Sequence, residues 1–159
     1  MISLSRAHKL IGVALVVVVG CTTHSDIPKV LRQLESSDIN IQAQARNSLE
    51  KADEGTKKKY IPFLIRMLEH HKYLVRFHAA DLLGAYGPLA KEAVPVLLKK
   101  LKDPHADVRV SVAFALGNIG FASDAVVSGL VEALRDPSGR INEGAVTSLG
   151  KIENGGEKA

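Results

Sequence analysis

The sequence has one cysteine, few aromatic residues and no tryptophan among its 159 residues. A single cysteine excludes an internal disulfide, and a thiolate metal site would need further cysteines. Aromatic residues make up only 4% of the chain, and alanine, leucine and valine dominate, which favours helices that pack through small and aliphatic side chains. The formal net charge is +4, and it falls to +2 without residues 1–20, because Arg6 and Lys9 leave with no acid. A charge this near balance does not indicate a nucleic-acid-binding protein.

The first twenty residues are basic and then apolar. Arg6 and Lys9 precede an uncharged run from Leu10 to Gly20, which is shorter than the roughly 20 residues that a membrane-spanning helix needs. A basic start, a short apolar centre and a small residue at its end are typical of a secretory signal peptide. The alternative is an N-terminal core helix, although four consecutive valines show no helical periodicity. We therefore expect residues 1–20 to be a signal peptide.

The stretch VVGC, residues 18–21, resembles the lipobox of bacterial lipoproteins, in which a small residue precedes a cysteine. The resemblance implies cleavage after Gly20 and lipidation of the Cys21 thiol, with residues 21–25 as a lipidated tether. The protein would then be exported and lipid-anchored to the cell envelope. Thr22 stands where Asp would retain such a protein at the inner membrane, which favours the periplasmic face of the outer membrane in a Gram-negative organism. A free, inert thiol is the alternative.

The rest of the chain contains an internal repeat of about 33 residues. Three columns of apolar residues recur in step across four copies: Leu34, Leu68, Leu101 and Leu134; Ile41, Val75, Val108 and Ile141; Leu49, Leu83, Leu116 and Leu149. Such a period indicates stacked units that bury a continuous core. We expect a repeat domain over residues 26–154, with copies at about 26–59, 60–92, 93–125 and 126–154. Residues 155–159 would be a disordered tail.

Each copy predicts two helices. In the third copy the first helix has one apolar face, and the second runs from about Val108 to a stop at Gly120. The Asp-Pro pairs at 103–104 and 136–137 interrupt the chain, and Asp107 is predicted to cap the second helix. A proline is expected in the first turn of the first helix of three copies, where a missing N–H costs little: Pro28, Pro62 and Pro95.

The stretch DPHADVRVSVAFALGNIG, residues 103–120, resembles the HEAT-repeat family in the short form named after phycobilisome lyases. The resemblance covers about residues 26–153 and implies an all-α fold, an α-α superhelix (solenoid) of four HEAT-like helix pairs. In that family Asp and Arg of successive copies often pair. The corresponding pairs here are Arg76 with Asp103 and Arg109 with Asp136, and Asn142 would end this ladder. The first copy lacks the Asp-Pro and the closing glycine, which suits a polar end copy.

We find no pattern of catalytic, metal-binding or cofactor-binding residues in the sequence. The adjacent His70 and His71 are expected to diverge, and the other histidines show no ligand spacing. Neither a Ser-His-Asp order nor a phosphate-binding glycine loop stands out, so we expect no catalytic residues, no metal, no cofactor and no small-molecule substrate. The alternative is a bilin-lyase-type enzyme or enzyme subunit that shares the repeat. The resemblance implies that such an enzyme acts on a cytoplasmic or stromal partner, from which an exported chain would be separated.

The remaining candidates for function are residues on the surface of the repeat array. Second helices usually line the concave side of such an array, and Phe77, Val110 and Phe114 could form an apolar patch there. The patch would be bordered by Arg76, His78 and Arg109; alternatively, Phe114 enters the seam between copies. The lysines at 57–59, 99, 100 and 102 are either solvated or in contact with anionic headgroups. We expect a scaffold or adaptor that binds an unidentified protein, with no nucleic-acid partner; an accessory without a dedicated partner is a third possibility.

Overall fold

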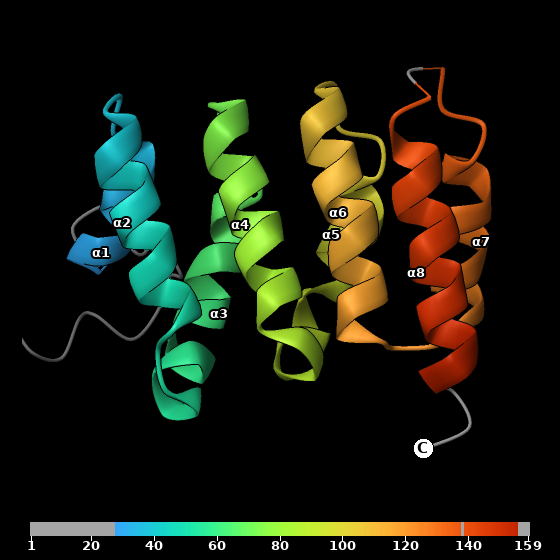
Figure 1. Cartoon of the computed structure of the whole chain (residues 1–159), viewed down its shortest axis with the longest axis horizontal. Coiled ribbons are helices and arrows are strands. Elements are labelled where there is room, and N and C mark those ends of the chain that lie inside the picture. Colours follow the sequence, from blue (N-terminus) through green and yellow to red (C-terminus); the bar gives the residue numbers. More distant parts are fainter. Residues whose placement is uncertain (1–27, 138, 156–159) are drawn as a thin grey trace, which may run out of the picture.

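The computed structural model describes residues 28–137 and 139–155, and within these ranges the chain is helical, without strands. Four helix pairs stand side by side along the long axis of the molecule (Figure 1). The first helices of the pairs are α1 (Lys29–Arg32), α3 (Glu54–Met67), α5 (Val94–Lys100) and α7 (Asp124–Ala133). The second helices are α2 (Ile39–Glu50), α4 (Tyr73–Ala85), α6 (Ala106–Ile119) and α8 (Ile141–Gly155). Short 3-10 segments follow α1 (η3, Gln33–Glu35) and precede α5 (η4, Gly87–Ala93). The predicted all-α solenoid is confirmed.

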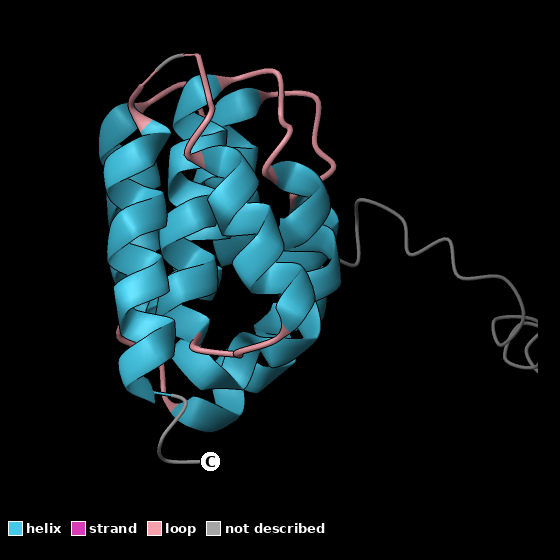
Figure 2. Cartoon of the chain, turned by 90° about the vertical axis from the view of Figure 1, so that its right-hand side faces the viewer, coloured by secondary structure: helices cyan, strands magenta, loops and turns pink. Residues whose placement is uncertain are grey.

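The helices form two layers with the apolar core between them. First helices lie in one layer and second helices in the other, as the view along the row shows (Figure 2). The columns of repeated leucines fill the space between the layers: Leu34, Leu68 and Leu101 from the first helices, and Leu49, Leu83 and Leu116 from the second, are all buried. Because burial of apolar area stabilises by about 25 cal/mol per Å², this continuous core holds the four pairs together.

Glycines set the close packing between neighbouring second helices. A Cβ atom at Gly84 would lie 2.9 Å from Cα of Ala115, and one at Gly117 would lie 2.3 Å from Oγ of Ser148. The contacts of α4 with α6 and of α6 with α8 are the most extensive in the described part of the fold. In α2 the repeat column of Gly84 and Gly117 is occupied by Glu50. The contact of α2 with α4 is much less extensive than the contacts of α4 with α6 and of α6 with α8. The residue in this column therefore decides how closely successive pairs stack.

Four local predictions are wrong. Helix α3 begins at Glu54, before the predicted copy boundary between residues 59 and 60, because the Asp53 side chain accepts a hydrogen bond of 3.0 Å from the Thr56 backbone N–H. Pro62 consequently lies inside α3 rather than in its first turn. His105, not Asp107, occupies the N-cap of α6, and Asp107 lies in the first turn. Helix α8 also includes Gly155, which was expected in the tail; residues 156–159 lie outside the described ranges.

Candidate functional site

Two arginines, the buried Arg76 and the partly buried Arg109, join successive helix pairs. Nε and Nη2 of Arg76 donate hydrogen bonds of 2.7 and 2.8 Å to the two carboxylate oxygens of Asp103. Arg109 donates two bonds of 2.7 and 3.1 Å to Asp136 in the same way. Nη1 of each arginine also bonds to carbonyl oxygens of the turn that precedes its own helix. Both pairs implied by the family resemblance are therefore present, as bidentate contacts that fix direction as well as distance.

The environment of this ladder shows that it is structural. Burial opposes ionisation of Asp103, but hydrogen bonds from Arg76 and the His105 backbone outweigh it, and the pKa of Asp103 is lowered. The hydrogen bond with Asp103 is the main reason that the pKa of Arg76 is raised. Arg76 is only 8% exposed, and the Arg109 side chain 14%. The prediction that these arginines border an exposed binding patch is therefore wrong, because their guanidinium groups are directed into the seams between pairs.

The ladder changes character at both ends. In the arginine column the first copy has Gln42, whose Nε2 donates a bond of 2.6 Å to the Ser36 carbonyl. The first two pairs are joined instead by Arg46, whose Nε lies 2.6 Å from Oδ2 of Asp81 at a part-exposed position. In the fourth copy, Oδ1 of Asn142 is buried and has no hydrogen-bond partner among the described residues. The repeat alignment did not indicate the pair of Arg46 with Asp81.

The predicted apolar patch is only half-exposed. Phe77 and Val110 pack against the core, and Phe114 is half-buried. A Cβ atom at Gly144 of α8 would lie 3.2 Å from the Phe114 ring, so Phe114 occupies the seam between α6 and α8. This arrangement matches the alternative considered above. His78 is also half-buried, and this burial lowers the pKa of its imidazole.

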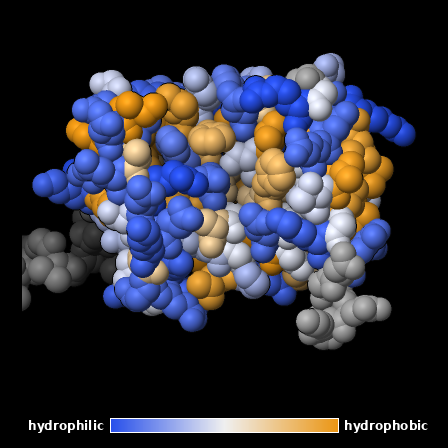
Figure 3. Space-filling view, in the orientation of Figure 1, coloured by the Kyte–Doolittle hydropathy of each residue, from blue (hydrophilic) through white to orange (hydrophobic). Residues whose placement is uncertain are grey.

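Four large apolar side chains are exposed at the first turns of α2 and α4. Their exposed fractions are 75% for Ile39, 37% for Ile41, 38% for Tyr73 and 41% for Leu74. We call these four residues the apolar edge. Figure 3 shows apolar surface at the upper left, over the beginning of α2. Sequence analysis missed the edge, although a signal exists: Ile39 and Tyr73 share a repeat column in which the later copies carry alanine and glycine.

The apolar edge continues into polar groups at the starts of α6 and α8. The Tyr73 ring stacks on His105, with ring centroids 3.5 Å apart and an interplanar angle of 11°. Farther along, Nη1 of Arg140 lies 2.5 Å from Oδ1 of Asp107. Apolar side chains beside a rim of aromatic and charged groups are the usual composition of a protein-docking surface.

The histidines do not form a metal site in the described ranges, where no three potential ligands cluster. The prediction that the side chains of His70 and His71 diverge is wrong: their ring centroids are only 4.3 Å apart. Burial lowers the pKa of His70, and the charge of Glu35 opposes this effect. Nδ1 of His70 accepts a hydrogen bond of 3.1 Å from the Lys72 backbone N–H, in the turn between α3 and α4.

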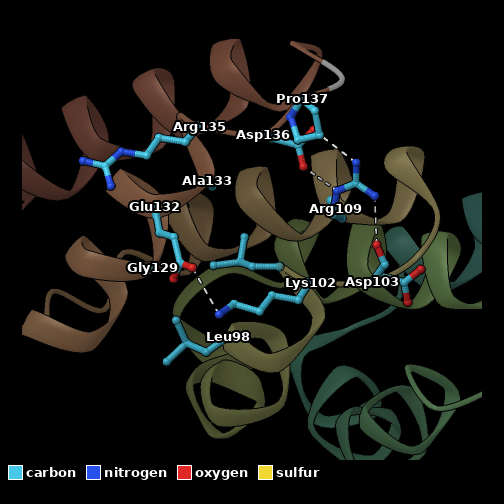
Figure 4. A pocket seen from close by; sticks show the side chains of 11 residues that line it. Leu98, Lys102, Asp103, Arg109, Gly129, Glu132, Ala133, Arg135, Asp136 and Pro137 are labelled. Carbon is cyan, nitrogen blue, oxygen red and sulfur yellow. Dashed lines mark hydrogen bonds and ion pairs between the residues drawn. The ribbon is translucent and has the colours of Figure 1, made fainter.

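A groove of about 520 Å³ opens between α5 and α7 in the first-helix layer (Figure 4). Gly129 lets Leu98 and Leu101 reach its floor, since a Cβ atom there would lie 3.1 Å from each leucine. Across its mouth, Nζ of Lys102 lies 3.1 Å from Oε1 of Glu132, and the ladder pair of Arg109 with Asp136 closes one end. These two ion pairs neutralise four of the charged groups that line the groove, and Arg135 adds a further cation to its lining.

The predicted signal peptide (residues 1–20), the tether (residues 21–25) and the lipidation residue Cys21 lie outside the described ranges. Among the helices that the structure does describe, none combines the length and apolar character needed to cross a membrane.

Comparison with known proteins supports the repeat architecture. The sequence profile of HEAT repeats matches residues 27–101 and 94–159. A crystal structure of an engineered protein is similar over 77% of this chain, with a TM-score of 0.55 and 21% sequence identity. The chain spans 60% of the length of that protein, so the likeness concerns the fold alone. No curated protein matches the chain in sequence.

Proposed function

The chain belongs to the HEAT-repeat family, and from this premise we propose that it is a protein-interaction scaffold or adaptor, held at the bacterial envelope by a lipid on Cys21. Stacked helix pairs make an extended, rigid surface, and proteins of this architecture use that surface for binding. The described residues supply such a surface at the starts of the second helices. We assign the partner contact to this part of the molecule.

The observation that supports the proposal most is the apolar edge. Ile39, Ile41, Tyr73 and Leu74 expose large apolar side chains although neighbouring positions of the same helices are fully buried. Neighbouring exposed apolar side chains with a polar rim often mark an interface, and a few such residues usually supply most of its binding energy. By contrast, the paired Arg76 and Arg109 are committed to the solenoid itself.

The membrane part of the proposal rests on the sequence around Cys21. Only the four residues from Thr22 to Ser25 separate Cys21 from the start of the repeat domain at Asp26, a reach of about 13–14 Å when extended. A lipid at Cys21 would therefore hold the repeat domain next to the bilayer. The acyl chains would contribute about 0.8 kcal/mol per buried methylene, which makes a two-chain anchor stable.

Capture of the partner tests the binding surface. In the lipidated protein, Ile39→Ser with Leu74→Ser should reduce crosslinking to its partner from envelope membranes about tenfold or more, because each removes an exposed anchor residue. The matched control is Val127→Ser with Val131→Ser, which removes two valines that are 39% and 45% exposed from α7, in the other layer. Both double variants should unfold within about 0.5 kcal/mol of the wild type.

Equal capture by wild type and by the Ile39 and Leu74 variant would remove the apolar edge from the proposal. A chain that captures no specific protein would instead be a structural accessory. The enzyme alternative, a bilin-lyase-type activity, is supported only by the kind of repeat, and the same repeat unit serves many unrelated functions.

A further inference from the structure

Charge is distributed unevenly between the two layers of helices. The first-helix layer of the first three copies, residues 29–35, 54–69 and 87–102, contains ten lysines and arginines and only four acids. The second helices, taken with their N-cap residues, contain seven lysines and arginines and six acids, over residues 38–51, 72–86, 105–120 and 139–153. The first-helix segment of the fourth copy, residues 124–136, reverses the sign, with one arginine and three acids. The excess positive charge therefore lies on one layer, in the three copies nearest the N-terminus.

Part of this charge is neutralised within the fold. Nζ of Lys58 lies 2.6 Å from Oε1 of Glu54, and Lys100 and Lys102 contact Glu69 and Glu132 at 2.6 and 3.1 Å. Four other basic residues are exposed and have no side-chain ion pair or hydrogen bond within the described ranges: Lys29, Arg32, Lys59 and Lys99. We call these four the basic face. It contains two residues of α1, one of α3 and one of α5.

The geometry brings the basic face together on one side. Helix α3 lies between α1 and α5 in the row (Figure 1), and the first helices share one layer, while the second helices, which carry the apolar edge at their starts, form the other (Figure 2). Lys59 and Lys99 are on the solvent side of their helices, since Ile61 and Leu64 of α3 and Leu97 of α5 are buried in the core. A surface that touches this layer would therefore meet cations from three successive pairs at once.

We propose that the basic face rests on the anionic headgroups of a lipid bilayer. The proposal rests on the membrane anchor assigned above and adds an orientation: the first-helix layer faces the bilayer, and the apolar edge faces away from it towards the protein partner. Each lysine or arginine near an anionic surface strengthens binding about fivefold, but only within a Debye length, about 10 Å at 0.1 M salt. The tether, about 13–14 Å when extended, lets the layer approach the headgroups to within that distance.

Vesicle binding by the unlipidated protein tests this orientation. The mature chain, residues 21–159 with Cys21→Ser, is mixed with vesicles of phosphatidylglycerol or of phosphatidylcholine. We expect the protein to bind only the anionic phosphatidylglycerol vesicles. This binding should be lost near 1 M salt, where the Debye length is about 3 Å. The double substitution Lys59→Gln with Lys99→Gln should weaken binding about 25-fold. Lys51→Gln with Lys151→Gln removes the same charge from exposed positions at the ends of α2 and α8, and should change binding less than about twofold.

Several results would overturn the proposal. Equal weakening by the two double variants would show that net charge, not this face, determines binding. Equal binding to both kinds of vesicle would show that headgroup charge does not matter. Binding to polyglutamate without binding to vesicles would assign the face to an acidic protein. Because the protein in this assay carries no lipid, each of these results leaves the lipid anchor at Cys21 to be decided separately.

Discussion

At the scale of the residue, the decisive contacts are those that the repeat places between copies. The Asp103 side chain is 1% exposed and accepts two hydrogen bonds from Arg76 and one from the His105 backbone. The pair formed by Arg46 and Asp81 has a single hydrogen bond, from Nε to Oδ2, and is about one-third exposed at both partners. Since removing one partner of a buried pair leaves the other charge uncompensated, the two carboxylates should differ greatly in their effect on stability.

Asp103→Asn should therefore lower the free energy of unfolding by about 3 kcal/mol, and Asp81→Asn by less than about 1 kcal/mol. The pKa of Asp103 is lower in the folded protein than the value of about 3.9 in an unfolded chain. The contribution of the ionised Asp103 to the free energy of unfolding is therefore fully present above about pH 4. It is lost as the pH falls through the lower pKa that Asp103 has in the folded protein. Urea unfolding of both variants and the wild type, at neutral and at acid pH, measures these free energies. Equal losses of stability in the two variants at neutral pH would contradict the prediction.

At the scale of the element, glycine decides where two helices touch. Gly117 and Gly150 occupy the same column of successive copies. A Cβ atom at Gly117 would overlap Ser148, whose Oγ donates a hydrogen bond of 2.8 Å to the Ala113 carbonyl. A Cβ atom at Gly150 would meet no other atom within 4 Å. The same substitution in two equivalent helices should therefore have opposite effects.

Gly117→Ala should destabilise the protein by about 1–3 kcal/mol, because α8 must move away from α6 to admit the methyl group. Gly150→Ala should leave stability unchanged or raise it by up to about 1 kcal/mol, since alanine favours the helix over glycine. Thermal unfolding of the two variants provides the comparison. Similar melting temperatures would mean that the column does not set the packing of α6 against α8.

At the scale of the whole molecule, the architecture was predictable and the exposed surface was not. Three columns in step across four copies require stacked helix pairs and locate the buried leucines. The two arginine pairs were implied by the resemblance to the HEAT-repeat family. The columns do not report how far a side chain between them protrudes. Phe114 therefore enters a seam because Gly144 leaves room for its ring, and Ile39 is exposed because no helix pair precedes the first copy among the described residues. The start of α3 was misplaced for a local reason, the cap at Asp53.

The central claim is that this solenoid acts while anchored to a membrane through Cys21. Intact-mass measurement of the protein isolated from the membrane fraction tests the claim most directly. We predict a chain that begins at Cys21 and carries the additional mass of its acyl groups. A chain with its N-terminus at any other residue, or with an unmodified Cys21, would contradict the anchor and with it the proposed place of work at the envelope.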